Sequence, residues 1–349
     1  MPPRAEAIPR VTPVSLETLR RQAATLQVAE RFFDSAVLFA LFELGIFAAL
    51  SSGRKTLDDL QQQTRGDRDT LEAILDAAVA LRVLSRKDGA YEASGALLDC
   101  LGQAGSPQYV GEWMSWLHAV APSLMRLAWS VRSGEPGIAA DLSPGDGTLD
   151  RIRTRAMDVY ARTHAPELAA RIDFSATNTL LDLGCGSGAY SFAIVERHPN
   201  VSATLLDLPE AIAEARAIAA GRGLAERLDF VAGDALTCEL GRSFDAVLVS
   251  NVLHMLGEAG SRTLLRRCHE LLRPGGRIIV QGQFLDEDRT SPRWATLLNL
   301  ILRAVTREGR NHSAAEGLAW LREAGFAEAH YVRFSPWNAN SALVGSRGN

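Results

Sequence analysis

The stretch Thr179-Leu-Leu-Asp-Leu-Gly-Cys-Gly-Ser-Gly188 decides the fold of this 349-residue chain. An apolar strand predicted over 179–183 runs directly into three glycines at alternate positions, Gly184, Gly186 and Gly188, and a helix is predicted over 189–197. Glycine lets the backbone turn at positive φ, and it lets a ligand approach where a Cβ would block it. A glycine turn between a parallel strand and a helix N-terminus is typical of a site for a nucleotide-like cofactor.

Three acidic residues bear on which cofactor this is. The glycine turn alone also satisfies the looser dinucleotide pattern G-x-G-x-x-G/A, so it leaves a nicotinamide cofactor open. Asp182 lies on the first strand, Asp207 ends a second strand (201–206), and Asp234 ends a third (228–232). A carboxylate after the second strand is placed to hold ribose hydroxyls, and one after the third is placed to accept from an adenine amino group. The ordered set resembles the S-adenosylmethionine site of class I methyltransferases, which favours that cofactor.

Composition excludes several classes of partner. The chain has 37 Lys and Arg against 41 Asp and Glu, and a net charge of −4 gives no reason to expect a polyanionic partner. The four cysteines lack C-x-x-C spacing, so we expect neither a metal site nor a disulfide framework. The N-terminus does not resemble a signal peptide, and the longest apolar stretch (36–50) is too short to span a bilayer. We therefore expect a cytoplasmic protein with no membrane partner.

The length suits two domains. From residue 177 onward, strands and helices alternate as in a doubly wound α/β sheet, with further strands predicted over 244–249, 277–283, 329–334 and 341–344. The last two strands are expected to form a hairpin about residues 336–338. The resulting division is a flexible leader (1–15), a winged-helix dimerisation domain (16–105), a helical linker and substrate-pocket region (106–176), and a Rossmann-like S-adenosylmethionine-binding catalytic domain (177–349).

The winged helix is predicted from a capped helix over 57–63, a longer helix ending at Arg82, and a hairpin with its turn at Asp88-Gly89. Such a module invites the hypothesis of a DNA-binding regulator. Between residues 56 and 93, however, five basic residues are opposed by eight acidic ones. Because that surface repels phosphate, a packing or dimerisation module is the preferred interpretation, and no nucleic-acid partner is expected.

His254 is the candidate catalytic base. It follows the strand predicted over 244–249, and residues just beyond the carboxyl end of a strand face the ligand crevice of an open α/β sheet. An imidazole has an ordinary pKa near 6.5, which suits taking a proton from a hydroxyl. A lone histidine is more often structural, but this position favours catalysis.

The chain resembles the small-molecule O-methyltransferases that act on caffeic acid, acetylserotonin and bacterial natural products, over nearly its whole length. The motifs that carry the likeness, besides the winged helix and the glycine turn, are Leu206-Asp207-Leu208-Pro209, Gly233-Asp234, Val252-Leu253-His254, Leu272 to Arg277, and Glu323 to Phe326. The resemblance implies a homodimer of secondary metabolism in which the residue matching His254 is the general base. The residues expected to contact the cofactor are Gly184, Gly186, Gly188, Asp207, Leu208, Asp234, Ala235 and Ser250. The residues expected to line the substrate pocket are Trp113, Met157, Tyr160, Asn299 and Asn311.

The chain departs from the family pattern beside the base. The family's histidine is usually followed by Asp-Trp, whereas Met255-Leu256 follows here, and Ser250 replaces a frequent lysine. Gly282 and Asn311 stand where plant members have glutamates. A carboxylate beside an imidazole orients it and stabilises its charged form. The departures leave open an acceptor that is already acidic, catalysis mainly by proximity, methylation at nitrogen or carbon, and a non-methylating reaction on the same fold.

Overall fold

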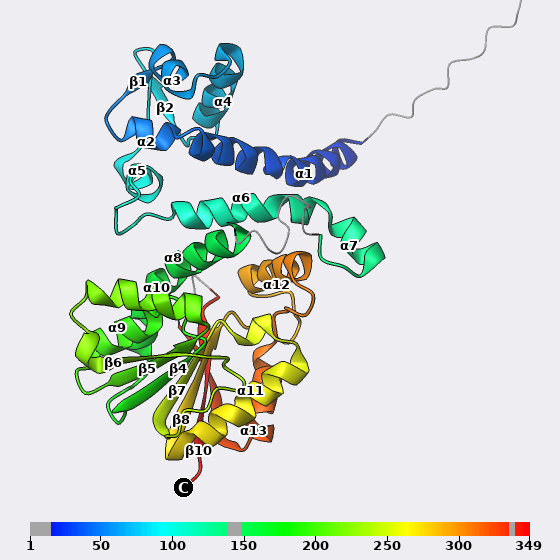
Figure 1. The fold of residues 1–349 in the computed structure, drawn as a ribbon. Coiled ribbons are helices and arrows are strands. Elements are labelled where there is room, and N and C mark those ends of the chain that lie inside the picture. The colour runs from blue at the N-terminus through cyan, green and yellow to red at the C-terminus, as the bar shows by residue number, and fades with distance from the viewer. Residues whose placement is uncertain (1–14, 138–147, 335–338) are drawn as a thin grey trace, which may run out of the picture. The chain divides into compact units, whose positions relative to one another are not determined.

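The computed structural model describes residues 15–137, 148–334 and 339–349, which fall into two compact units, Met1–Gly111 and Glu112–Asn349 (Figure 1). The turn predicted about 336–338 and nearly all of the predicted leader lie outside the described residues. The four-part division drawn from the sequence stays a prediction.

The first unit combines helices with a small sheet. Its elements are α1 (Leu16–Glu43), α2 (Ile46–Leu50), β1 (Lys55–Thr56), α3 (Leu57–Thr64), α4 (Arg68–Ala80), β2 (Ser85–Lys87), β3 (Ala90–Glu92) and α5 (Gly95–Leu101). Thr56 and Asp59 close a capping box at the start of α3. Asp88 and Gly89 take φ of 52° and 76°, and they make the predicted turn between β2 and β3. The order of helix, helix and hairpin is the one expected of a winged helix.

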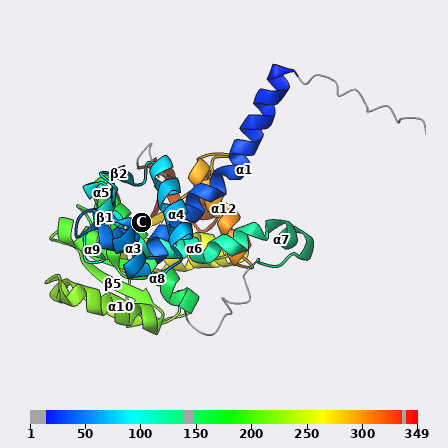
Figure 2. The same ribbon diagram turned by 90° about the horizontal axis from the view of Figure 1, so that it is seen from above.

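Helix α1 is long and exposes several large apolar side chains. Figures 1 and 2 show it extending beyond the small helices of its own unit. Phe32 and Phe33 are 51% and 56% exposed, and Leu16, Leu19, Leu26 and Val28 are exposed as well. So many exposed apolar side chains on one helix are typical of a surface that another protein covers.

The second unit holds a seven-stranded sheet with the order β6-β5-β4-β7-β8-β10-β9. Its strands are β4 (Thr179–Leu183), β5 (Ser202–Asp207), β6 (Leu228–Ala232), β7 (Phe244–Ser250), β8 (Leu272–Gly282), β9 (Phe326–Arg333) and β10 (Ser341–Arg347). The five strands from β6 to β8 are parallel, and β10 is antiparallel to β8 and β9. Strand β8 begins five residues earlier than predicted, because Leu272 already pairs with Phe244 before an irregularity in the register.

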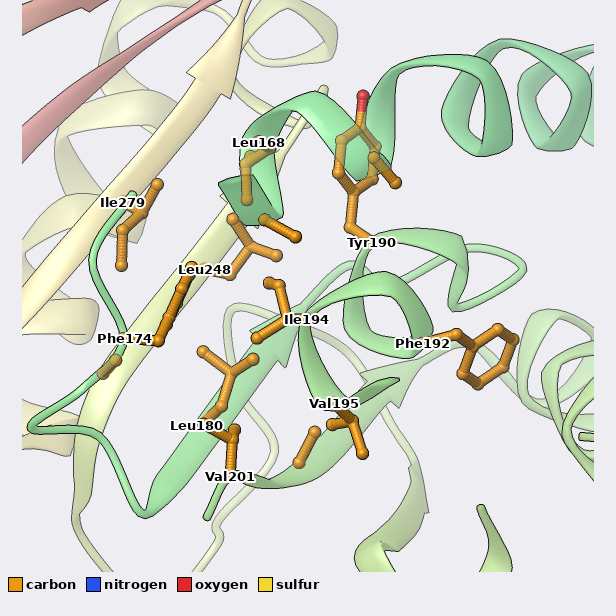
Figure 3. Packing of buried hydrophobic residues seen from close by; sticks show 14 of the residues in the cluster. Leu168, Phe174, Leu180, Tyr190, Phe192, Ile194, Val195, Val201, Leu248 and Ile279 are labelled. Atoms are coloured by element: carbon orange, nitrogen blue, oxygen red, sulfur yellow. The ribbon is translucent and has the colours of Figure 1, made fainter. Parts of the chain in front are cut away.

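Helices cover both faces of this sheet (Figure 1). The helices of the unit are α6 (Gly111–Met125), α7 (Leu127–Ser133), α8 (Thr148–Arg171), α9 (Ala189–Arg197), α10 (Pro209–Ala220), α11 (Glu258–Leu271), α12 (Arg293–Val305) and α13 (Ala314–Glu323), with short 3₁₀ turns η2 (Ala225–Arg227) and η3 (Leu253–Met255). Successive residues of a strand point to opposite faces, so Leu180 packs with α8, α9 and α10, whereas Leu181 packs with α11 and α13. Figure 3 shows the first of these two cores, where Leu168 of α8 and Ile194 of α9 meet the sheet. Burial on both faces explains why the parallel strands are nearly continuous apolar runs.

The strand order reverses at β4. The chain passes from β4 to β5 on one side and later returns to β7 on the other side of β4. The two connections therefore leave the carboxyl ends of β4 and β7 in opposite directions, and open α/β sheets bind their ligands at such a reversal.

Candidate functional site

The glycine turn between β4 and α9 has the conformation that its sequence predicts. Gly184, Gly186 and Gly188 all have positive φ, at 79°, 55° and 82°. A Cβ on Gly188 would meet Phe192 at 2.6 Å and Leu205 at 2.7 Å, so this glycine is required for packing. A Cβ on Gly186 would meet nothing within 4 Å. Gly186 therefore leaves its backbone open to an approaching ligand.

Asp207 ties the turn to the neighbouring strand. Its Oδ2 accepts a hydrogen bond from the backbone N–H of Gly186 at 2.7 Å, and its Oδ1 accepts one from the N–H of Leu208 at 2.7 Å. The backbone carbonyl of Asp207 also accepts from the N–H of Gly233, just before Asp234. The ends of β4, β5 and β6 are thus joined, and the half-buried carboxylate keeps lone pairs that can accept further hydrogen bonds.

Asp234 and Asp182 have contrasting environments. Asp234 is exposed, and its Oδ1 accepts from the N–H of Leu236 at 2.6 Å. Asp182 is 1% exposed, and its Oδ2 accepts from the Ser191 hydroxyl at 2.6 Å while its buried Oδ1 has no hydrogen-bond partner. Burial, with a smaller contribution from the charge of Asp207, raises the pKa of Asp182 to about 7.

A buried amide network lies at the ends of β7 and β8. Gln281 Oε1 accepts from the Ser250 hydroxyl at 2.7 Å and from Asn251 Nδ2 at 2.7 Å. Gln283 Nε2 donates to the Tyr160 hydroxyl at 2.7 Å and to Asn340 Oδ1 at 2.9 Å. The network fixes Asn251, which has a left-handed φ of 56°, directly after β7. Of the network members, the sequence analysis named only Ser250 and Tyr160 as site residues. Gln281 and Gln283, two polar residues that follow the apolar run Ile278-Ile279-Val280 at the end of a strand, could have indicated the network.

His254 lies in η3, just beyond β7, and lines a small hollow. Residues 281–284 at the end of β8, Leu253, Asn311 and His312 complete its walls. Burial lowers the pKa of His254 to about 4, and the charge of His312 adds to this shift. His254 is therefore neutral near pH 7 and able to accept a proton. The sequence flagged His312 only as a histidine that could lie near the pocket.

The segment that carries His312 is held in place by backbone bonds. The carbonyl of His254 accepts from the N–H of Arg310 at 2.9 Å, and the carbonyl of His312 accepts from the N–H of Leu285 at 2.9 Å. Ser313 then begins α13 with a capping box to Glu316. The chain after α12 is thus fixed against η3 and the end of β8.

Among the predicted pocket residues, Trp113 and Tyr160 pack together as aromatic rings, and Asn299 and Asn311 are hydrogen-bonded to each other. Trp113 lies with its ring centroid 5.5 Å from that of Tyr160 and 6.2 Å from that of Trp294. Met157, one turn before Tyr160 on α8, is 36% exposed. Asn311 is 3% exposed, and its Nδ2 donates to the carbonyls of Gln283 and Ala295, while Asn299 accepts from the Asn311 N–H at 2.9 Å.

Two further features bear on the chemistry. Within the described ranges, no three His, Cys, Asp or Glu side chains are grouped as a metal site would require. Across residues 15–137, 148–334 and 339–349, no helix combines the length and the apolar character that crossing a membrane requires.

Two family models match the chain: an O-methyltransferase domain over residues 137–327 and an O-methyltransferase dimerisation domain over residues 26–112. The chain belongs to this O-methyltransferase family. The 3-hydroxy-5-methyl-1-naphthoate 3-O-methyltransferase of Streptomyces sahachiroi is 30% identical over 91% of this chain and 93% of the relative. The N,N-dimethyltransferase OxyT of Streptomyces rimosus is 27% identical over 90% of this chain and 94% of its own.

One similar solved structure contains a ligand related to the cofactor. PigF with SAH, the product that S-adenosylmethionine leaves after methyl transfer, matches with a TM-score of 0.83 at 25% identity, over 93% of this chain and 99% of its own. The chain is an S-adenosylmethionine-dependent O-methyltransferase. The open backbone at Gly186 and the carboxylate of Asp207 fit such a cofactor.

Proposed function

We propose that this O-methyltransferase methylates a hydroxyl group on a small aromatic or polyketide-like natural product, with His254 as the general base. The observation that carries the proposal is the side chain of Gln283. It lines the hollow beside His254 and also hydrogen-bonds to Tyr160, which packs against Trp113. A flat acceptor that stacks on these aromatic rings would have a hydroxyl near the neutral imidazole.

The cofactor supplies an activated methyl group on a sulfonium. The glycine turn, Asp207, Leu208, Asp234, Ala235 and Ser250 are proposed to hold it at the ends of β4 to β7. The task of the protein is then to align acceptor and methyl group with water excluded. His254 would take the proton that the acceptor hydroxyl loses, and the hydroxyl oxygen would keep the bonding electron pair. Because the imidazole is neutral at pH 7, its basic form is available without prior deprotonation.

The experiment measures formation of S-adenosylhomocysteine with a panel of hydroxynaphthoic acids, simple phenols and aromatic amines. Turnover of the hydroxylated acids and phenols, with the amines inactive, is the expected result. Turnover of amines alone would favour N-methylation, which the relative OxyT keeps as the second candidate. Binding of the cofactor without any methyl transfer would favour a non-methylating enzyme on this fold.

His254→Ala tests the base on whichever hydroxylated acceptor is turned over. We expect kcat to fall about 10²–10⁴-fold, because a positioned general base contributes this much, while the affinity for S-adenosylhomocysteine is unchanged. His269→Ala, on the half-buried histidine near the end of α11, is the control and should keep its rate. An unchanged rate in His254→Ala would remove His254 from the mechanism.

The dimerisation-domain match and the exposed apolar side chains of α1 support a homodimer. The cytoplasmic location predicted from the sequence stays a prediction.

A further inference from the structure

The side-chain amide of Gln283 is held through its nitrogen alone. Nε2 donates to the Tyr160 hydroxyl at 2.7 Å, to Asn340 Oδ1 at 2.9 Å and to Asn251 Oδ1 at 3.1 Å. Two of these three oxygens belong to amides and cannot donate, so a flipped Gln283 would place oxygen against oxygen. Among the hydrogen bonds of the described residues, none is donated to Gln283 Oε1. The orientation of the amide is therefore fixed, and its oxygen is left over.

This oxygen faces accessible space, although Gln283 as a whole is only 2% exposed. Oε1 is not among the sealed side-chain atoms of the described residues that lack a partner. Gln283 lines the small hollow beside His254, and the enclosed part of that hollow has room for about one water-sized group. Because buried polar atoms are normally hydrogen-bonded, we expect a small donor from outside the protein to meet Oε1 in the hollow.

The hydroxyl that is methylated cannot be this donor. It has a single proton, and in the proposed function that proton goes to His254, which lines the same hollow. An amide oxygen only accepts hydrogen bonds, so Gln283 needs a proton from a second group. Two hydroxyls on adjacent carbons of an aromatic ring lie about one hydrogen-bond length apart. A second hydroxyl in that position therefore fits a hollow of this size.

We propose that Gln283 determines substrate specificity, in that its Oε1 accepts a hydrogen bond from a second hydroxyl on the ring carbon next to the methylated one. This rests on the proposed function. The preferred acceptors are then aromatic compounds with two adjacent hydroxyls. A single hydroxyl leaves Oε1 unsatisfied, and a methoxy group beside the hydroxyl presents only lone pairs and adds a methyl group. A site built to bind a hydroxyl rejects analogues without it, because its own buried polar atom is then unpaired.

The first test measures binding of three probes by calorimetry, with the full-length protein saturated with S-adenosylhomocysteine. The probes are naphthalene-2,3-diol, 2-naphthol and 3-methoxy-2-naphthol, which share one ring system and differ at one position. We expect the diol to bind about tenfold tighter than 2-naphthol, counted per hydroxyl, since one hydrogen bond contributes about this much. The methoxy compound should bind more weakly than 2-naphthol. Equal affinities, or no detectable binding of any probe, would overturn the proposal.

Variants separate the oxygen of Gln283 from its nitrogen. Gln283→Met keeps the length of the side chain and removes Oε1, and Gln283→Leu is the second variant if the first does not fold. In either variant the diol should bind no tighter than 2-naphthol, per hydroxyl. Tyr160→Phe is the matched control, because it removes one oxygen beside Nε2 while Asn251 and Asn340 still hold the amide. It should keep the preference for the diol, whatever its effect on the three affinities together. A preference that persists in both Gln283 variants would overturn the proposal.

The second test follows methyl transfer from S-adenosylmethionine to the same probes. In the wild type, kcat/KM per hydroxyl should be about tenfold higher for the diol than for 2-naphthol, and Gln283→Met should remove this difference. Transfer to both probes with equal kcat/KM would overturn the role of Gln283 and leave the proposed function standing. Tighter binding of the diol without methyl transfer to any acceptor would instead support the specificity and overturn the proposed function.

Discussion

Asp207 shapes the glycine turn, and the same carboxylate is proposed to bind the cofactor. It receives two backbone N–H groups at 2.7 Å, one from Gly186 and one from Leu208. Hydrogen bonds to an ionised group are about twice as strong as neutral ones. Loss of this side chain should therefore disturb the turn as well as remove the proposed ribose ligand.

Asp207→Ala is predicted to weaken binding of S-adenosylhomocysteine about 10–100-fold, which corresponds to about 1.4–2.8 kcal/mol. Isothermal titration calorimetry measures it directly. Asp229→Ala is the matched control, since Asp229 is an exposed aspartate on β6 that pairs with Arg242. Equal affinity in wild type and Asp207→Ala would contradict the assignment.

Asp182 predicts a specific dependence of stability on pH. Its pKa is about 7 in the folded protein and near 3.8 in the unfolded chain, so the folded state holds the extra proton between these values. The stabilisation from this group is present in full below about pH 4 and is lost as the pH rises towards 7. Asp182→Asn should not lose it, because an amide does not ionise. The free energy of unfolding of the variant should gain on wild type by up to about 1.4 kcal/mol per pH unit across that window.

Urea unfolding at pH 5, 6, 7 and 8 measures this difference. Ser191→Ala removes the hydroxyl that donates to Asp182 but keeps the carboxyl group, so it should retain the wild-type trend. A constant difference between Asp182→Asn and wild type at all four pH values would show that the carboxyl group is not perturbed.

Two glycines of the turn are required for different reasons: Gly188 for packing and Gly186 for the open space at its backbone. Gly188 and Gly186 both have left-handed φ, so alanine at either position carries a backbone strain of about 1–2 kcal/mol. Alanine at Gly188 adds an overlap with Phe192 and Leu205, worth about 1–3 kcal/mol more. Alanine at Gly186 meets open space instead.

Gly188→Ala should therefore lower the melting temperature more than Gly186→Ala does. Gly186→Ala should show the larger loss of affinity for S-adenosylhomocysteine relative to its loss of stability, because its methyl group enters the space left for the ligand. Thermal melts with and without S-adenosylhomocysteine give both quantities. The reverse ranking would mean that the ligand does not approach Gly186.

The sequence predicted elements better than it predicted contacts between them. Strands β4 and β6 begin and end where the apolar runs do, whereas the hydrogen bond from the glycine turn to Asp207, at the end of β5, was not predicted. The network that joins Tyr160, Gln283 and Asn340 was not foreseen, since its members are up to 180 positions apart. Hydrophobic periodicity reports which face of an element is buried, but it carries no information on which buried amide meets which.

The two units differ in how far their apolar side chains are covered. The sheet of the second unit is covered on both faces by its own helices, whereas α1 of the first unit exposes apolar side chains along most of its length. Exposed apolar side chains gathered on one helix are typical of a surface that a partner covers. A second copy of the chain is the cover that we propose.

Sedimentation velocity at micromolar concentration should give a species of twice the 37.7 kDa of one chain. Replacing Phe32 and Phe33 together by Asp should shift it to the monomer, since charges on a buried interface are costly. Leu81→Asp, at an exposed leucine that follows α4, is the control and should leave the dimer intact. A monomer in the wild type would refute the homodimer.

Strand β10 lies between β8 and β9 in the sheet, although it follows both of them along the chain. During synthesis on the ribosome, β9 emerges before the strand that will join it to the sheet. Until Ser341–Arg347 leaves the exit tunnel, the edge of β8 presents unpaired N–H and C=O groups, which are a template for contacts with other nascent chains. The residues proposed to bind the cofactor all precede β8, yet β8 gains its second neighbour only when β10 has emerged.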